Sequence, residues 1–156
     1  MPHGVAVAVA IGTPRIRARV VKNLAFGEHE FPTLLHSTVT IGGSFRHGPG
    51  LIALAGVSIG TNVDVGSHVH LNPHAVLGHD VVCHDYVSIN PNATLSGDCV
   101  VGSRTLLGAN STVLQQLTLG ADVIVGAAAC VTRSVPDGHT VIGVPARTAQ
   151  NGGTAR

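Results

Sequence analysis

The stretch from Leu77 to Thr112 decides the fold, because it divides into six consecutive units: LGHDVV, CHDYVS, INPNAT, LSGDCV, VGSRTL and LGANST. The first residue of every unit is aliphatic or cysteine, and the fifth is small or aliphatic. A period of six matches neither the helical turn nor the two-residue alternation of an ordinary strand. The stretch therefore predicts a repeat architecture of short strands separated by corners.

The same register extends in both directions, from Leu35 to Pro136, without an insertion. Only His47 interrupts the apolar first column, and the residue after this column is often Gly or Asn, which tolerate tight corners. The first column comprises Leu35, Ile41, His47, Ala53, Ile59, Val65, Leu71, Leu77, Cys83, Ile89, Leu95, Val101, Leu107, Val113, Leu119, Val125 and Val131. Three units make one coil, so residues 18 apart should stack at the strand spacing of about 4.8 Å. We expect an all-β fold, a parallel β-helix.

The residues before the repeat predict a short βα remnant. The apolar run from Val5 to Ile11 is typical of a buried parallel strand. Thr13 and Pro14 then suit the N-cap and first position of a helix. Ile16, Val20, Val21 and Leu24 follow at helical spacing and predict its apolar face, which leaves Arg15, Arg17, Arg19 and Lys22 on the other faces.

Three regions follow from these patterns. We expect a partial α/β segment over residues 1–33, the β-helix over residues 34–147 and a disordered tail over residues 148–156. One strand and one helix do not make a stable sheet alone, so the first region predicts the last piece of an α/β unit.

Composition restricts the partners and the location. The net charge is +1 and only 11% of the 156 residues are charged, without a block of one sign, which argues against nucleic-acid and anionic-membrane surfaces. The longest apolar run is too short to span a bilayer and lacks the features of a secretory signal. Cys83, Cys99 and Cys130 form no C-x-x-C pair, and they predict free thiols in a reducing cytoplasm.

The hexad [Leu/Ile/Val]-Gly-x-x-[small]-x resembles the bacterial hexapeptide-repeat transferase superfamily. This resemblance implies a left-handed β-helix and a homotrimer. Four segments narrow this resemblance to one family, because they are similar to the sialic acid O-acetyltransferases. That family includes N-acetyltransferases of nucleotide-linked aminosugars. These segments are Ala10-Ile11-Gly12, Phe31-Pro32-Thr33-Leu34-Leu35-His36, Gly78-His79-Asp80-Val81-Val82 and Ile142-Gly143-Val144-Pro145-Ala146-Arg147. The implied activity is transfer of an acetyl group from acetyl-CoA to an amino or hydroxyl group of a free or nucleotide-linked sugar, without a metal.

The sequence departs from this family at two places. The family's Gly-rich nucleotide-binding turn has no counterpart, since Gly12-Thr13-Pro14 is the only candidate and Pro14 lacks a donor. We therefore expect acetyl-CoA to bind and nucleoside diphosphates to bind weakly. Many members also carry a second histidine nine residues after the first, where this chain has Ser88.

Acetyl transfer from a thioester requires a base, oxyanion donors and alignment of the two substrates. His79 is the candidate base, because it falls at a corner and an imidazole has an ordinary pKa near 6.5. Asp80 is its candidate partner at Nδ1. The resemblance places the catalytic histidine and its acidic partner at these two positions.

The candidate cofactor-binding residues are Ser88, Gly97, Ala109, Ala127 and Arg147. Gly97 comes one coil after His79, so its N–H is a candidate oxyanion donor. Ala109 and Ala127 would flank the pantetheine arm, and Arg147 would approach the CoA phosphates. Four other histidines, His68, His70, His74 and His84, are expected to be surface or interface groups.

Two alternatives remain open from sequence. The γ-class carbonic anhydrases share this fold and bind zinc through three histidines, and His79 and His84 have the spacing of two of them. The third ligand would fall at Gly43, however, and His47 is four residues out of register. The other alternative is a trimeric scaffold without enzymatic activity.

Overall fold

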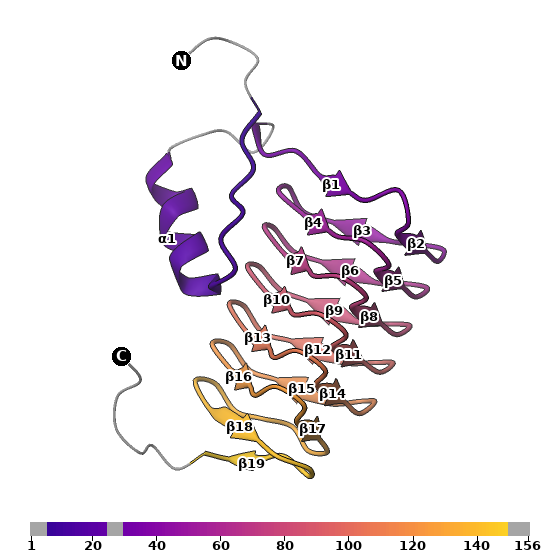
Figure 1. Cartoon of the computed structure of the whole chain (residues 1–156), viewed down its shortest axis with the longest axis vertical. Helices are drawn as coiled ribbons and strands as arrows, with labels where there is room; N and C mark the ends of the chain where they lie inside the picture. The colour runs from indigo at the N-terminus through magenta and orange to yellow at the C-terminus, as the bar shows by residue number, and fades with distance from the viewer. Residues whose placement is uncertain (1–5, 25–29, 150–156) are drawn as a thin grey trace.

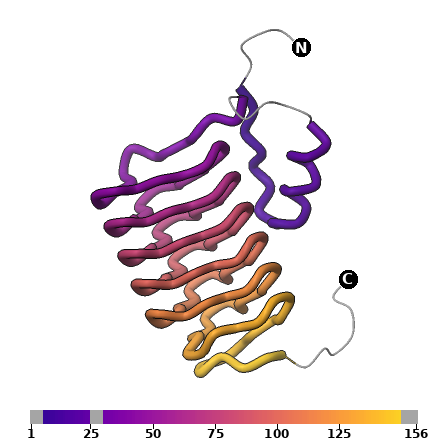
Figure 2. The backbone as a smooth tube through the Cα atoms, turned by 180° about the vertical axis from the view of Figure 1, so that it is seen from behind, coloured from indigo at the N-terminus to yellow at the C-terminus, as the bar shows by residue number. Residues whose placement is uncertain are grey.

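A computed structural model describes residues 6–24 and 30–149 as a left-handed parallel β-helix with one helix, α1 (Pro14–Leu24), beside it (Figures 1 and 2). Most strands have two residues, and successive coils stack along one axis from β1 to β17. The predicted fold class is therefore confirmed.

Three sheets form the walls of the β-helix, and they are called A, B and C here. Sheet A contains β1 (Leu34–Leu35), β4 (Ile52–Ala53), β7 (His70–Leu71), β10 (Ser88–Ile89), β13 (Leu106–Leu107), β16 (Ile124–Val125), β18 (Thr140–Ile142) and β19 (Arg147–Thr148). Sheet B contains β2 (Thr40–Ile41), β5 (Ser58–Ile59), β8 (Val76–Leu77), β11 (Thr94–Leu95), β14 (Thr112–Val113) and β17 (Cys130–Val131). Sheet C contains β3 (Arg46–His47), β6 (Asp64–Val65), β9 (Val82–Cys83), β12 (Val100–Val101) and β15 (Thr118–Leu119).

From β1 to β17 the pairing register is the one that the repeat predicts, whereas β18 pairs with β16 two residues short of it, with Ile124 opposite Thr140. Ser88 pairs with His70 on one side and with Leu106 on the other, one coil away in each direction. The chain turns between walls at an A–B, a B–C and a C–A corner in each coil. Asn62, Asp80 and Asp98 take positive φ near 60° at the B–C corner, where their short polar side chains tolerate the left-handed conformation.

The two apolar columns point inward and form a continuous core from Leu51 to Val141. The first coil departs from the prediction, since Leu35 and Ile41 are 43% and 44% exposed and His47 is also exposed. Each inner layer is covered by the coils on both sides of it, whereas the first coil has a neighbouring coil on one side only. The inward column is therefore buried only from the second coil onward.

Helix α1 begins as predicted, but Arg17 is buried in place of Ile16 beside the partly buried Val20, Val21 and Leu24. Pro14 is its first residue, and the Thr13 carbonyl accepts the first intrahelical hydrogen bond, from the Arg17 N–H at 2.9 Å. Arg17 is fully buried, whereas Ile16 is 43% exposed, so the expected assignment of these two side chains is wrong. The polar acceptors beneath the helix explain the difference, because they bind the guanidinium group.

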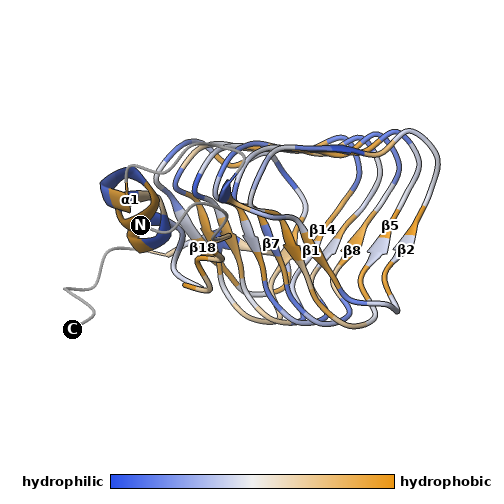
Figure 3. Ribbon diagram, turned by 90° about the horizontal axis from the view of Figure 1, so that it is seen from above, coloured by the Kyte–Doolittle hydropathy of each residue, from blue (hydrophilic) through white to orange (hydrophobic). Residues whose placement is uncertain are grey.

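The expected strand before α1 is also corrected. Val5 lies outside the described residues, and residues 6–11 are assigned to no strand. Val9 alone among residues 6–11 is buried. This segment runs between α1 and the β-helix, and Figure 3 shows α1 outside the coils on one side.

Helix α1 and the residues around it cover the C–A corner. Arg15 Nε binds Asp122 Oδ1 at 2.8 Å, and Asp122 also binds Arg104 of the coil before it. Phe31 meets the edge of the His68 ring at 4.7 Å between centroids, and His68 stacks on Tyr86 at 5.3 Å. This corner is thus held by ion pairs and aromatic contacts between the β-helix and the flank.

At the other end, β18 and β19 pair in antiparallel fashion, and Val141 lies opposite Thr148. Thr148 is therefore still part of the fold, and the rest of the predicted tail, residues 150–156, lies outside the described residues. Cys83 and Cys99 are buried, Cys130 is partly exposed, and all three are free thiols. Within the described ranges, no helix has both the length and the apolar character needed to cross a membrane.

Candidate active site

His79 and Asp80 project from the B–C corner that follows β8. Leu77 anchors this corner in the core, and Asp80 takes the left-handed φ of 58° that the corner requires. The same corner recurs in every coil, so residues 18 apart form columns along its edge. Asn62 lies one coil before Asp80, and Gly97 lies one coil after His79.

The His79 ring is fixed by a carboxylate. Its Nδ1 lies 2.8 Å from Asp80 Oδ2, and the Asn62 amide donates to Asp80 Oδ1 at 2.6 Å. The hydrogen bond from Asn62, and after it the one from His79, lowers the pKa of Asp80 below its ordinary value. An ionised Asp80 accepts from Nδ1–H, and this tautomer leaves a lone pair on Nε2. The imidazole is therefore poised to accept a proton at Nε2.

The site is open to solvent. The His79 and Asp80 side chains are 69% and 48% exposed. The predicted pairing of His79 with Asp80 is present in the structure, and Asn62 completes a chain of three residues. Sequence reasoning missed Asn62, although its position one coil before Asp80 was available from the repeat.

Gly97 lies directly against the His79 ring, as the register predicts. A Cβ at residue 97 would come 2.4 Å from His79 Nε2, so only glycine leaves the ring in this position. The Gly97 carbonyl accepts from Gln116 N–H at 3.0 Å, and the His79 carbonyl accepts from Asp98 N–H at 2.8 Å. The Gly97 N–H has no acceptor within residues 6–24 and 30–149. It is therefore an available donor beside the candidate base.

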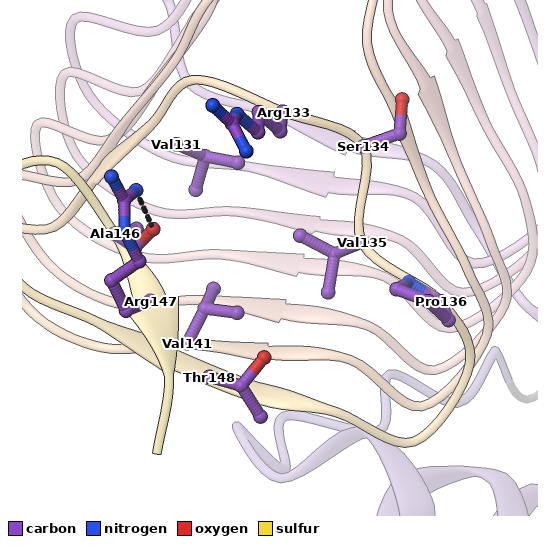
Figure 4. A pocket seen from close by; sticks show the side chains of 9 residues that line it. All are labelled: Val131, Arg133, Ser134, Val135, Pro136, Val141, Ala146, Arg147 and Thr148. Carbon is purple, nitrogen blue, oxygen red and sulfur yellow. Dashed lines mark hydrogen bonds between the residues drawn. The ribbon is translucent and has the colours of Figure 1, made fainter.

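Arg147 lies at the end of the β-helix, in a cavity of about 170 Å³ that Arg133 also lines (Figure 4). Arg133 belongs to the same corner column as His79, three coils further along. Arg147 Nη1 donates to the Ala146 carbonyl at 2.9 Å. Neither arginine takes part in an ion pair with a described carboxylate. Two uncompensated cations thus share this pocket, and Arg133 is a second residue that sequence reasoning missed.

The structure does not bring the other predicted cofactor residues to His79. Ala109 and Ala127 are on the A–B corner, a different edge of the same chain. Ser88 is completely buried in sheet A, where its Oγ donates to the Gly12 carbonyl at 2.9 Å and accepts from Arg17 Nη2 at 3.0 Å. The prediction that Ser88 binds the cofactor is wrong, because it has no exposed surface.

Arg17 holds the N-terminal segment on sheet A. Its guanidinium group donates to the carbonyls of Ile11, His68 and Tyr86 at 2.6, 2.9 and 2.8 Å. Burial lowers the pKa of Arg17 to about 10, which leaves it charged at neutral pH. No sequence signal marks Arg17, since arginines on a helix are normally exposed.

The four other histidines singled out from the sequence divide into two pairs. His74 and His84 are exposed, as expected. His68 and His70 are only 5% and 8% exposed, so the expectation of surface groups is wrong for them. Burial, and after it the charge of Arg17, lowers the pKa of both rings. Within the part of the chain that the structure describes, no three His, Cys, Asp or Glu side chains cluster as metal ligands would.

Comparison with known proteins agrees with this geometry. Residues 80–115 match the family model for the bacterial transferase hexapeptide (six repeats). A search of curated proteins by sequence gave no match.

Solved structures are similar over nearly the whole chain. The acetyltransferase domain of PglB from Neisseria gonorrhoeae is 32% identical, with a TM-score of 0.87 over 92% of this chain and 70% of that one. Perosamine N-acetyltransferase from Caulobacter crescentus, solved with CoA and GDP-perosamine, is 32% identical, with a TM-score of 0.88 over 94% and 70%. WeeI from Acinetobacter baumannii is 28% identical, with a TM-score of 0.88 over 96% and 73%.

Proposed function

The chain belongs to the family of hexapeptide-repeat acetyltransferases that act on sugars, and we propose that it transfers the acetyl group of acetyl-CoA to an amino group of a sugar, with His79 as general base. The observation that carries this assignment is the Asp80–His79 pair, whose Nε2 is open to solvent beside an unused backbone donor. The similar enzyme solved with GDP-perosamine supports an amine as acceptor, free or on a nucleotide-linked sugar.

The proposed reaction uses few groups of the protein. Nε2 of His79 takes a proton from the amine as its nitrogen attacks the thioester carbonyl, and Asp80 stabilises the imidazolium that forms. The tetrahedral intermediate then collapses, the C–S bond breaks, and His79 returns the proton to the CoA thiolate. The products are an acetamido sugar and free CoA.

The Gly97 amide is proposed as the donor to the oxyanion. It lies next to the His79 ring and has no acceptor within the described residues. A fixed N–H that faces the developing charge lowers the barrier without reorganisation. Gly97 thus combines two functions, because its missing side chain also leaves room for the ring.

Acetyl-CoA is proposed to run along the B–C corner, parallel to the β-helix axis. Three coils separate His79 from Arg133, which is about 14 Å at the usual strand spacing. The thioester would lie at His79, and the phosphates would lie at Arg133 and Arg147, the two cations of the end pocket. Arginine suits phosphate because its donors match two oxygens at once.

A homotrimer is part of the proposal. Ala109 and Ala127 can line the pantetheine arm only if a second copy brings its A–B corner to the B–C corner of the first. The edges of a prism allow such contacts around a threefold axis. Light scattering should give three times the chain mass, and a monomer at micromolar concentration would contradict the shared site. The cytoplasmic location predicted from the free thiols also belongs to this proposal.

The decisive experiment measures acetyl transfer from acetyl-CoA to a panel of nucleotide-linked aminosugars that includes GDP-perosamine. His79→Asn should preserve the trimer and acetyl-CoA affinity and lower kcat by at least about 10²-fold, the usual scale for a general base. His84→Asn, at another exposed histidine, is the matched control. Full activity of His79→Asn would move the base elsewhere, and failure of every acceptor would reject the proposed function.

A further inference from the structure

Asn62 projects from the B–C corner between β5 and β6, one coil before the corner that carries the candidate base. It takes the same left-handed φ of 58° as Asp80 in the next coil. The Asn62 N–H donates to the Gly43 carbonyl at 2.8 Å, and the Asp80 N–H donates to the Thr61 carbonyl at 2.9 Å. Both backbones are therefore fixed by neighbouring coils, and the two side chains lie side by side in one column.

The Asp80 carboxylate is bound at both of its oxygens. Oδ1 accepts from Nδ2 of Asn62 at 2.6 Å, and Oδ2 lies 2.8 Å from Nδ1 of His79. An ionised carboxylate only accepts, so the amide of Asn62 and the Nδ1–H of His79 are both donors. With one donor at each oxygen, the plane of the carboxylate is set, and with it the direction in which Oδ2 meets the ring.

Packing does not provide this orientation. The His79 and Asp80 side chains are 69% and 48% exposed, and an exposed short side chain is free to change between staggered rotamers. Among the described residues, Asn62 and His79 are the only side chains that hydrogen-bond to Asp80. The orientation of the His79 ring therefore depends on Asn62, although the two side chains share no hydrogen bond.

An amide also suits this position by its charge. The hydrogen bond from Asn62 is the largest cause that lowers the pKa of Asp80, and that from His79 comes second. Because an amide does not titrate, it favours the ionised carboxylate without adding a charge beside the ring. Asp98 occupies the same column one coil beyond Asp80, and an ionised carboxylate there has no proton to donate. The donor to Asp80 thus comes from the preceding coil alone.

We propose that Asn62 is a positioning residue for acetyl transfer, which holds the Asp80 carboxylate so that His79 keeps its proton on Nδ1 and its lone pair on Nε2. This inference rests on the proposed function. Asn62 acts through Asp80 and is not required to touch either substrate. Its loss should therefore lower kcat and leave KM for both substrates unchanged, the pattern of an interaction that matters only in the transition state.

Steady-state kinetics give the first test. Asn62→Gly removes the amide and keeps the left-handed backbone, and kcat should fall about three- to tenfold, the range of one neutral hydrogen bond. Asn62→Gln should recover part of this loss, because Gln116 takes a φ of 61° in the same column and shows that the corner accepts glutamine. Ser44→Gly, in this column with a φ of 58°, is the matched control. An unchanged kcat in Asn62→Gly would contradict the proposal.

The tautomer of His79 gives a readout that a merely structural role would not move. The full chain is labelled with ¹⁵N-histidine and studied by NMR at pH 8, where a free imidazole is neutral. The His79 signals are identified by their loss in His79→Asn. The unsubstituted protein should show a protonated Nδ1 and a bare Nε2, whereas Asn62→Gly should show the proton shared between the two nitrogens. Identical nitrogen shifts in the two proteins would overturn the proposal.

A double-mutant cycle tests whether Asn62 acts through Asp80. In an Asp80→Ala background the amide has no carboxylate to hold, so Asn62→Gly should cause no further loss of kcat. Residues in one hydrogen-bonded chain are expected to be non-additive in this way, whereas independent sites add. The same fold-loss from Asn62→Gly in both backgrounds would show that Asn62 acts elsewhere and would reject the proposal.

Failure of this inference is distinguishable from failure of the proposed function, because the tautomer is measured without an acceptor. If Asn62→Gly changes the His79 tautomer but no sugar of the panel is acetylated, the proposed function is rejected and the hydrogen-bonded chain stands. If the unsubstituted protein acetylates a sugar and Asn62→Gly alters neither the tautomer nor kcat, the positioning role is rejected and the proposed function stands.

Discussion

The B–C and C–A corners of this β-helix have the same backbone and opposite surroundings. At the B–C corner, His79 and Asp80 project into solvent and bind each other. At the C–A corner, His68 lies buried between Phe31 and Tyr86, beneath the segment that Arg17 fastens. A polar residue at a corner of the repeat is thus exposed or buried according to what covers it. The hexad repeat places each of these residues at a corner, and contact with the N-terminal flank decides whether its side chain is buried.

The largest effect should come from a change that removes both corners at once. Val101 is completely buried in sheet C, and Val101→Asp places an unpaired carboxylate in the core, which costs several kcal/mol. We expect an unfolded or insoluble protein. Thr118→Asp, on the outward face of the paired strand, should melt cooperatively near the wild-type temperature. A soluble, cooperatively melting Val101→Asp protein would show that this column does not face inward.

The next variant should weaken the contacts at the covered C–A corner and leave the exposed B–C corner intact. Arg17→Met leaves the carbonyls of Ile11, His68 and Tyr86 without their donor, and we expect a loss of about 2–4 kcal/mol in stability of the N-terminal segment. Hydrogen exchange should increase in residues 6–24 and remain slow in the β-helix core. Arg19→Met, at an exposed position of α1, should change nothing measurable. Equal exchange in the two variants would contradict the fastening role of Arg17.

The stability of the protein should also fall in acid, because His70 is buried where the N-terminal segment covers sheet A. The pKa of His70 is lowered to about 4 by burial, and after that by Arg17 and His68, whereas an unfolded histidine titrates near 6.5. The unfolded chain therefore binds more protons between these values, and stability falls as pH decreases through this window. At pH 5 the loss from His70 should be on the order of 2 kcal/mol. Denaturant titrations at pH 7.5 and 5 should show a smaller difference in His70→Leu, and an identical difference would contradict the neutral buried ring.

The smallest predicted effect concerns the open corner alone. Gly97→Ala puts a Cβ where the His79 ring lies, so the ring must move, and kcat/KM should fall about tenfold with little change in stability. Gly43 occupies the same corner column, and a Cβ there meets nothing within 4 Å, so Gly43→Ala is the matched control. Wild-type kinetics in Gly97→Ala would mean that the observed ring position is not the reactive one.

Sequence reasoning was most successful where one short-range rule repeats. The period of six predicts the pairings from β1 to β17 but not that of β18 with β16, which falls two residues short of the register. It also places Gly97 beside His79, because stacking follows directly from the register. It also permits the pairing of His79 with Asp80, which are neighbours in the chain. The prediction that Ser88 binds the cofactor failed, because it was taken from the family resemblance and did not consider that the N-terminal segment covers sheet A. The burial of Arg17 was not predicted, because the sequence of a charged helical residue does not show that backbone carbonyl groups distant in the chain accept hydrogen bonds from it.

The sequence by itself determined the β-helix, its register, the inward columns and the corner that carries the candidate base, because each depends on residues at a fixed separation. Only the tertiary structure decided which corners are covered, since the flank and the repeat are connected by no periodicity. It buried His68, His70, Ser88 and Arg17 under one segment and left His79 open. It also brought Arg133 and Arg147 to one pocket at the end of the coils. The physical reason is that local repetition fixes backbone geometry, whereas burial and charge depend on contacts between segments distant in the chain.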